Sequence, residues 1–287
     1  MAVETGLSKS ANFARVREIE FVELFQGNIR KLIEALGVTR MIQKESGSVL
    51  KVLKVTGTLE NGSSVAEGDI IPLSEYATTW TPIGEMTLKK WRKATSIEAI
   101  NDKGYNQAVT KTTDKMMKQI QRGIRTDFFT FLATGTGTAT GADFQATLAQ
   151  CWGQLQVLFE DSDIEAVYFM NPLDVADYLG SHNITIETVF GMQYVKNFMG
   201  LGDVFFNSDV PQGKIYATAK ENVVCYYVNA GAADINEGFA FTTDQTGLIG
   251  IHEYADYDRD TVNDSVVSGI KFFAENLGGV VVGTIGE

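Results

Sequence analysis

The sequence predicts an α+β protein in which an N-terminal arm, an extended hairpin and one long helix precede a mixed body of helices and strands. Three observations lead to this fold class. Apolar residues recur at steps of three and four over residues 97–133, which is the spacing of one helix face. Strand-type runs separated by turn residues fill residues 48–96 and the chain after residue 202. No internal repeat and no flexible linker divides these segments.

The first 96 residues are expected to form the arm and the hairpin. Residues 15–37 carry apolar side chains at a helical spacing, and Gly37 is placed to end that helix. Residues 49–55 and 86–94 have the character of two strands. The turn residues between them are Gly57, Asn61, Gly62, Gly68, Pro72 and Pro82. We therefore expect a long hairpin with a polar tip, and because it cannot bury both faces on its own body, it should lie on something else.

Residues 97–133 are expected to form a long helix with one apolar and one basic face. The apolar positions are Val109, Thr113, Met116, Ile120, Ile124, Phe128 and Phe131. The basic positions on the opposite face are Lys111, Lys115, Lys118, Arg122 and Arg125. The helix should end at the Gly-rich run 134–143, which we interpret as a flexible connector.

The rest of the chain is expected to alternate between helices and strands. Asp143 is a plausible N-cap for a helix over residues 144–159, and residues 164–170 should form a buried strand. Asn171 and Pro172 open a short helix that reaches Leu179. After residue 202, seven strand-type runs follow, and GFAFTTD (residues 238–244) is one of them.

Charge is distributed unevenly along the chain. Residues 1–85 contain nine Lys and Arg against eleven Asp and Glu, whereas residues 86–125 contain ten against three. Residues 126–287 contain five against twenty-two, and the net charge of the whole chain is -12. Solubility is better served by interspersed signs. The segregation favours a basic limb lying on an acidic body, within one chain or between neighbouring copies, although two solvated faces of opposite sign remain an alternative.

Composition excludes several classes of protein. The 287 residues are 44% hydrophobic and 21% charged, which is ordinary for a globular domain. No apolar run is long enough to cross a bilayer, and the first residues lack a secretory signal, so we expect synthesis in the cytoplasm and no membrane. Cys151 and Cys225 should be buried free thiols.

Candidate chemistry is sparse. The Gly-rich run 134–143 lacks the ending of a phosphate loop, and the acids Asp256, Asp258 and Asp260 lack the glycine and glutamate of a calcium loop. Neither His182 nor His252 lies in a catalytic motif. The basic segment lies in an acidic chain without a nucleic-acid motif. We therefore expect no catalytic residues, no cofactor and no metal.

Four further segments complete the pattern of arm, hairpin, long helix and body. They are VAEGDIIPLSEY (65–76), FFTFLATGTG (128–137), YFMNPLDVADYL (168–179) and VPQGKIYATAKENVVCYYV (210–228). In this order and spacing, nearly the whole chain resembles the major capsid proteins of tailed bacteriophages, whose Hong Kong 97-like fold is also used by encapsulins. The resemblance implies this division of the chain: N-terminal arm 1–46, extended hairpin loop 47–96, spine helix and peripheral domain 97–143, mainly axial domain 144–250, and terminal strands, peripheral or axial, 251–287.

The resemblance also implies a function and partners. The chain should be a structural subunit of an icosahedral phage head, not an enzyme, and should self-assemble into pentamers and hexamers in the host cytoplasm. The finished virion capsid would enclose double-stranded DNA without specific recognition. Because only about 45 residues precede the hairpin, a separate scaffold protein is expected beside a portal. An encapsulin-type cellular nanocompartment shell and a soluble α+β enzyme or binding protein remain alternatives.

Combined with the uneven charge, the resemblance predicts an interface between subunits in which the hairpin loop and the basic limb meet acids of the next copy. Its predicted residues are Lys51, Lys54, Glu67, Lys89, Lys90, Arg92, Lys93, Lys111, Asp256, Asp258, Asp260 and Asp264.

Overall fold

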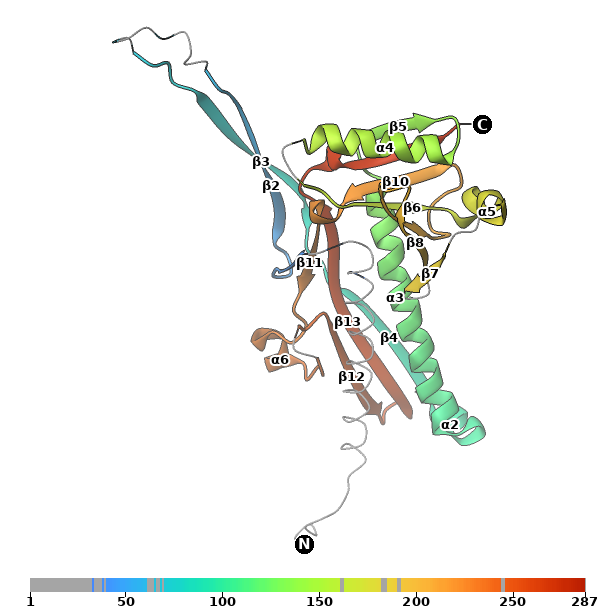
Figure 1. Cartoon of the computed structure of the whole chain (residues 1–287). Coiled ribbons are helices and arrows are strands. Elements are labelled where there is room, and N and C mark those ends of the chain that lie inside the picture. Colours follow the sequence, from blue (N-terminus) through green and yellow to red (C-terminus); the bar gives the residue numbers. More distant parts are fainter. Residues whose placement is uncertain are drawn as a thin grey trace.

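The chain folds into two β-sheets joined by a long helix, with a hairpin that projects away from them (Figure 1). The computed structural model describes residues 40–60, 70–160, 163–181, 185–189, 192–243 and 246–286, together with Ile33, Val38, Val65 and Gly68. The expected N-terminal helix over residues 15–37 lies outside the described residues except for Ile33, which is buried in the main core.

The larger sheet has seven strands and is covered by a helix. Its order is β5 (Gly137–Gly141), β14 (Val280–Ile285), β10 (Lys214–Ala219), β6 (Ala166–Met170), β9 (Gly202–Phe206), β8 (Met192–Phe198) and β7 (Glu187–Val189). Helix α4 (Phe144–Leu158) lies across β5, β14 and β10 (Figure 1). It begins as expected at Asp143, whose side chain accepts a hydrogen bond of 2.7 Å from the backbone N–H of Ala146. The expected buried strand is confirmed as β6, and α5 (Pro172–Ser181) follows it.

The smaller sheet is organised around one long strand. Its members are β1 (Arg40–Gln43), β11 (Val223–Val228), β13 (Thr261–Ala274), β12 (Ile249–Asp256) and β4 (Lys89–Ser96). The first half of β13 pairs with β12 on one edge and with β4 on the other, whereas its second half pairs with β11. Short helical turns complete the body: α6 (Ala233–Gly238), η3 (Lys220–Asn222) and η4 (Leu277–Gly279).

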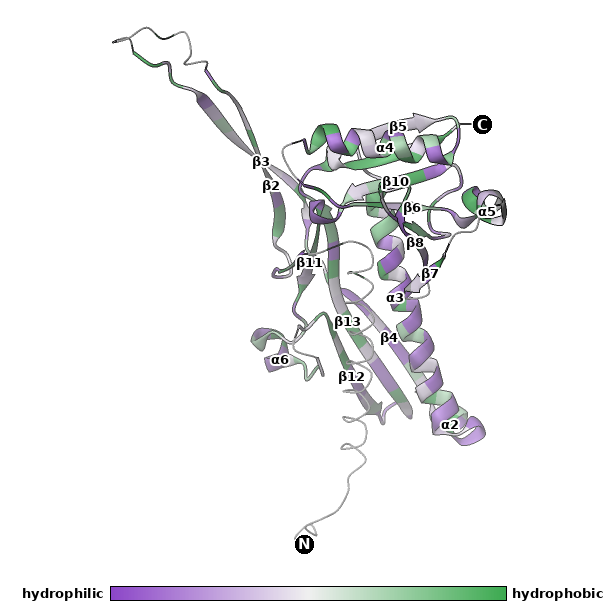
Figure 2. Ribbon diagram, in the orientation of Figure 1, coloured by the Kyte–Doolittle hydropathy of each residue, from purple (hydrophilic) through white to green (hydrophobic). Residues whose placement is uncertain are grey.

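The long helix α3 (Lys111–Leu132) ties the two sheets together. The ring of Phe128 lies 5.5 Å from that of Phe169 on β6 and 5.1 Å from that of Phe272 on β13, both edge to face. These three aromatic side chains therefore join both sheets into one core. Figure 2 shows that α3 changes from mainly hydrophilic residues near α2 (Ile97–Lys103) to hydrophobic ones where it enters between the sheets.

The helical segment differs in two details from the expected continuous helix. Gly104, at φ 77°, ends α2 (Ile97–Lys103), and a π-helical turn η2 (Asn106–Thr110) leads into α3. The expected core residues Met116 and Phe131 are only half-buried. The buried residues of α3 are Thr113, Met117, Ile120, Ile124, Phe128, Phe129 and Leu132. The buried face is wider than one stripe because the end of the helix contacts two sheets.

The hairpin is confirmed, but its second arm is not the predicted one. Strand β2 (Val49–Thr58) pairs with β3 (Glu75–Glu85), and the predicted arm over residues 86–94 instead falls largely in β4 of the smaller sheet. Pro82, predicted to be a turn residue, lies within β3 beside a β-bulge. Leu50 pairs with Gly84 and Lys51 with Pro82, so Ile83 between them is the extra residue of the bulge.

Two other sequence-based expectations were wrong. Residues 137–141 of the supposed flexible connector form β5, which pairs in parallel with β14. Their glycines allow close packing, because a Cβ on Gly137 would lie 2.6 Å from the backbone oxygen of Gly278. The described part of the predicted strand 238–244 is not a strand: Gly238 ends α6, and residues 239–243 make a single bridge, from Thr242 to Ile251.

The two sheets draw on several of the expected segments. Strand β11 lies inside the range 144–250 but belongs to the smaller sheet, while β5 and β14 lie outside that range and belong to the larger one. Among the described residues, no helix is long and apolar enough to cross a membrane.

Candidate assembly surfaces

The hairpin β2–β3 exposes an extensive apolar surface. Strand β3 extends away from the two sheets (Figure 1), most of it is exposed, and Tyr76 and Trp80 are 59% and 63% exposed. The tip was expected to be polar, yet its described residues include Ile70, Ile71 and Leu73, which are 94%, 72% and 92% exposed. Figure 2 shows hydrophobic residues along both arms. A two-stranded ribbon is marginally stable alone, and exposed apolar surface of this kind marks a contact site.

Strand β4 has an inward and an outward face. Antiparallel partners share a face of a sheet, so Trp91 and Lys93 point to α3 together with their β13 partners Val266 and Asp264. Lys90 and Arg92 point away from α3 with Val267 and Ser265. The basic segment is therefore divided between the interior and the surface.

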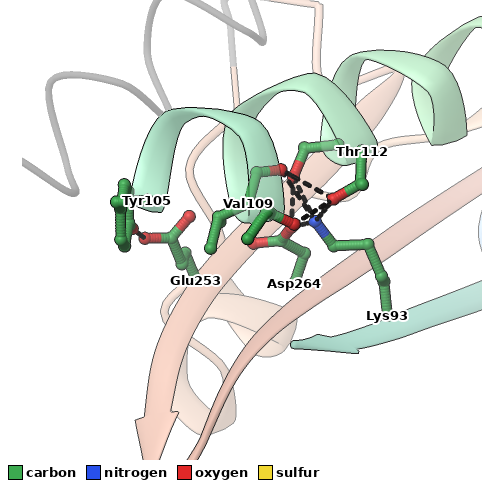
Figure 3. Close-up of polar contacts among 8 residues, drawn as sticks. Lys93, Tyr105, Val109, Thr112, Glu253 and Asp264 are labelled. Atoms are coloured by element: carbon green, nitrogen blue, oxygen red, sulfur yellow. Dashed lines mark hydrogen bonds and ion pairs between the residues drawn. The ribbon is translucent and has the colours of Figure 1, made fainter. Parts of the chain in front are cut away.

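Lys93 forms a buried polar cluster with Asp264 at the π-helical turn (Figure 3). Its Nζ lies 2.8 Å from Oδ2 of Asp264 and donates to Oγ1 of Thr113 at 2.7 Å. It also donates to Oγ1 of Thr112 at 2.8 Å and to the backbone oxygen of Val109 at 3.0 Å. Thr113 donates in turn to Asp264 or to the Val109 oxygen. Asp264 is 1% exposed, so removing one partner would leave a buried charge.

This cluster corrects the predicted role of two residues. Lys93 and Asp264 were expected at an interface between subunits, but they pair inside one chain because their positions in β4 and β13 face α3. The cluster pins η2 to the smaller sheet. Beside it, the hydroxyl of Tyr105 donates to Glu253 on β12 at 2.7 Å, which holds the same end of the helix (Figure 3).

Two other predicted basic residues pair with acids of the same chain at the surface. Arg92 lies 3.7 Å from Asp256, and Lys89 contacts Asp127 of α3. The side chains of Arg92 and Lys89 are about half exposed, so each pair contributes only about 0–1 kcal/mol.

The remaining predicted interface residues lie on the surface or outside the description. Lys51, Lys90 and Lys111 are exposed, as are Asp258 and Asp260 in the turn between β12 and β13. Glu67 and the side chain of Lys54 lie outside the described residues. The acidic turn is the exposed end of a strand pair, and Tyr257 projects from it.

The residues considered in the sequence for catalysis or metal binding are the cysteines, the histidines and the acidic side chains. Burial raises the pKa of both cysteine thiols to about 12, so Cys151 and Cys225 stay protonated at neutral pH. His252 stacks on Tyr254 in β12, and His182 lies outside the described residues. Within the described ranges, no group of three His, Cys, Asp or Glu residues is arranged to hold a metal ion.

Sequence reasoning missed one surface feature. A hollow of about 360 Å³ lies on the outward face of the smaller sheet, between α6 and strands β4 and β13. Its mainly apolar lining includes Leu88, Ile235, Phe239, Phe241 and Val267. The sequence signal for this hollow lay in the run GFAFTTD (residues 238–244). Its residues Phe239 and Phe241 were predicted to lie in a strand, whereas in the structure they line the hollow.

Comparison with known proteins gives a fold. No family model matches the sequence, and no curated protein matches it. Among solved structures, the mature capsid of bacteriophage PhiM1 matches with a TM-score of 0.57 and 9% identity, over 87% of this chain and 86% of that chain. The virus-like particle from Pyrococcus furiosus matches with a TM-score of 0.52 and 13% identity, over 92% and 99%. The holo-SrpI encapsulin complex from Synechococcus elongatus matches with a TM-score of 0.51 and 8% identity, over 85% and 84%.

These likenesses extend over most of each chain. They confirm the fold that the sequence resemblance implied: this protein has the Hong Kong 97-like fold of phage capsids and encapsulins.

Proposed function

We propose that this chain is the structural subunit of an icosahedral phage head, and that it self-assembles into pentamers and hexamers that enclose double-stranded DNA. The observation that carries the proposal is the β2–β3 hairpin, which presents Tyr76, Trp80 and an aliphatic tip without covering them. A freestanding domain gains nothing from such a hairpin, whereas a shell subunit lays it across its neighbour.

The arrangement suits heterologous contact between copies. The hairpin and the surface that receives it are different parts of the chain, so each copy can bind one neighbour and be bound by another. Such contacts close into rings when the rotation between copies allows it. In this proposal the smaller sheet with α3 forms the peripheral domain, and the larger sheet with α4 lies around the five-fold and six-fold axes.

Surface charge sets the register of these contacts. Lys51, Lys90 and Lys111 are exposed, and the acids Asp258 and Asp260 form an exposed turn. Each exposed pair between copies is worth about 0–1 kcal/mol, but a shell repeats every pair many times. The assembled particle should therefore be sensitive to salt.

The proposal includes partners and excludes catalysis. A separate scaffold protein guides assembly, a portal admits DNA, and the shell encloses that DNA without reading its sequence. No enzymatic activity is proposed: Lys93 and Asp264 form an ion pair, and Cys151 and Cys225 are buried as neutral thiols.

A second candidate is the shell of an encapsulin-type cellular compartment. The likeness to the Synechococcus elongatus encapsulin complex favours it nearly as much as the likeness to phage capsids favours the first, since the TM-scores are 0.51 and 0.57. Both candidates share the shell and differ in its contents.

Electron microscopy of the purified protein tests the shell, and analysis of particle contents separates the candidates. Closed icosahedral particles support the proposal, whereas a single species of 31.4 kDa at all concentrations and salt conditions contradicts it. Nuclease-resistant DNA with a portal identifies a phage head; an enclosed enzyme without DNA identifies the second candidate.

A further inference from the structure

The hollow beside α6 has a mainly apolar lining. It occupies about 360 Å³ on the sheet face turned away from α3, and Ile235, Phe239 and Val267 form part of its wall. Phe239 is 65% exposed and stacks on Phe241 with ring centroids 5.8 Å apart. An open apolar wall of this size, large enough for several side chains, marks a binding site.

The charged groups at the hollow are few. Lys90 and Asp234 contribute to its lining, and no ion pair of Lys90 is found within the part of the chain that the structure describes. An incoming acidic group would therefore lie on the Lys90 side, away from Asp234.

The hairpin tip has the matching chemistry. Ile70, Ile71 and Leu73 are nearly fully exposed, and Leu59 on the other arm adds a fourth aliphatic side chain. The exposed acids Glu60 and Glu75 flank this cluster.

The tip cannot reach the hollow of its own chain. The ladder between β2 and β3 is continuous out to the pair Thr58 and Glu75, apart from one bulge near its base. At about 3.3 Å per residue this ladder carries the tip roughly 30 Å outward, and Figure 1 shows it projecting away from α6. The tip of the same chain therefore does not fill the hollow.

We propose that the hollow is the seat for Ile70, Ile71 and Leu73 of a neighbouring copy, with Lys90 on its rim facing Glu75 or Glu60 of the incoming hairpin. This inference rests on the proposed function and names the partner surface of the hairpin. Each copy has one tip and one seat, so a closed ring fills every seat. The seat also adjoins the base of its own hairpin, because Leu88 lines the hollow and packs against the Leu50 and Met86 cluster. Successive hairpins around a ring thus form one continuous interface.

Cysteine cross-linking tests the seat. The double variant Ile71→Cys with Phe239→Cys, assembled and then oxidised, is expected to give covalent multimers on a non-reducing gel. The native thiols do not interfere, because Cys151 and Cys225 are both 0% exposed. Thr78→Cys with Phe239→Cys is the matched control, since Thr78 is exposed on β3 but lies short of the tip; it should give monomers.

Mixing two single variants shows whether the disulfide joins two copies or forms within one chain. Mixed single variants, Ile71→Cys in one copy and Phe239→Cys in another, should give dimers and nothing larger. Closed particles without the 71–239 link overturn the seat but leave the proposed shell intact; failure of the unmodified protein to form particles contradicts the shell itself. A cross-link from Phe239→Cys to Phe25→Cys would instead assign the hollow to the N-terminal arm and also overturn the proposal.

Aliphatic replacement gives an independent measurement. Ile70→Ser with Ile71→Ser should raise the subunit concentration needed for assembly by tenfold or more, which corresponds to about 1.4 kcal/mol or more, because the variant no longer buries two aliphatic side chains in the seat. An unchanged threshold would contradict the seat.

Discussion

The β2–β3 hairpin and strand β4 follow one another in the chain, yet they are stabilised in different ways. Strand β4 pairs with β13, and its residues Trp91 and Lys93 point to α3, so this helix covers one face of the strand. Strand β3 is longer, at 11 residues against 8, but it pairs only with β2 and none of its residues is fully buried. Strand pairing alone therefore does not make a stable element. A covering layer does, and among the described residues none supplies such a layer for the hairpin; in the proposed shell a neighbouring copy supplies it.

The largest expected effect separates assembly from folding. Replacing Tyr76 and Trp80 with Ser should leave the free energy of unfolding of the subunit within about 0.5 kcal/mol, because both side chains are exposed. The same change should abolish particles, as electron microscopy would reveal. The control Trp91→Ser should lower subunit stability, since Trp91 packs against the core. Equal loss of stability in both variants would contradict the claim that β4, but not the hairpin, is stabilised by packing within the subunit.

The buried pair under β4 should give the largest effect on subunit stability. Asp264→Ala is expected to cost about 3–5 kcal/mol in urea denaturation, because Lys93 would be left as a buried, unpaired charge. Combining Lys93→Met with Asp264→Leu should recover most of that loss. Asp258→Ala is the matched control at an exposed site and should change stability by less than about 0.5 kcal/mol. A small effect of Asp264→Ala would mean that β4 does not depend on this cluster.

The body should also respond to alkaline pH. Burial raises the pKa of the Cys225 thiol from 9.0 to about 12, so the folded chain keeps a proton that the unfolded chain releases above pH 9. The contribution of this thiol to the free energy of unfolding is therefore constant below pH 9. It falls by about 1.4 kcal/mol per pH unit as the pH rises from 9 toward 12. Urea denaturation at pH 9 and pH 10 should show a smaller drop for Cys225→Ala than for the unmodified chain. Identical drops would show that the thiol is not protected.

The smallest effects are expected at the exposed ion pairs. Lys89→Ala should change subunit stability by less than about 1 kcal/mol, and 1 M salt should reduce that change further. Lys89→Glu with Lys90→Glu should nevertheless weaken assembly, because the altered charges recur at each interface. Particle yield and salt tolerance equal to those of the unmodified protein would remove these lysines from the interface.

Sequence patterns predicted the parts of this fold that depend on local signals. The N-cap at Asp143, the buried strand β6 and the first arm of the hairpin were all correct, because each is encoded within a few neighbouring residues. The second arm was misplaced because Pro82 has turn chemistry, and only the bulge at the neighbouring Ile83 of β3 shows how this strand tolerates it. Likewise, the glycines of β5 allow close packing against β14, a segment more than 130 residues later.

The candidate surfaces were predicted less well than the elements. Uneven charge correctly indicated a basic limb against acidic strands, but it did not reveal that Lys93 and Asp264 would face inward, since that depends on the register between β4 and β13. The seat beside α6 depends on residues from β4, α6 and β13, which are distant in sequence. The aliphatic run at residues 70–73 was visible in the sequence, but turn residues around it suggested a polar tip.

The most direct test of whether another copy covers the hairpin is hydrogen exchange of the backbone amides in β2 and β3. The exchange rates are compared between the free subunit and the assembled particle. The expected result is rapid exchange of the hairpin in the free subunit, strong protection in the particle, and equal protection of β4 in both. Hairpin amides that are as well protected in the free subunit as in the particle would contradict this account.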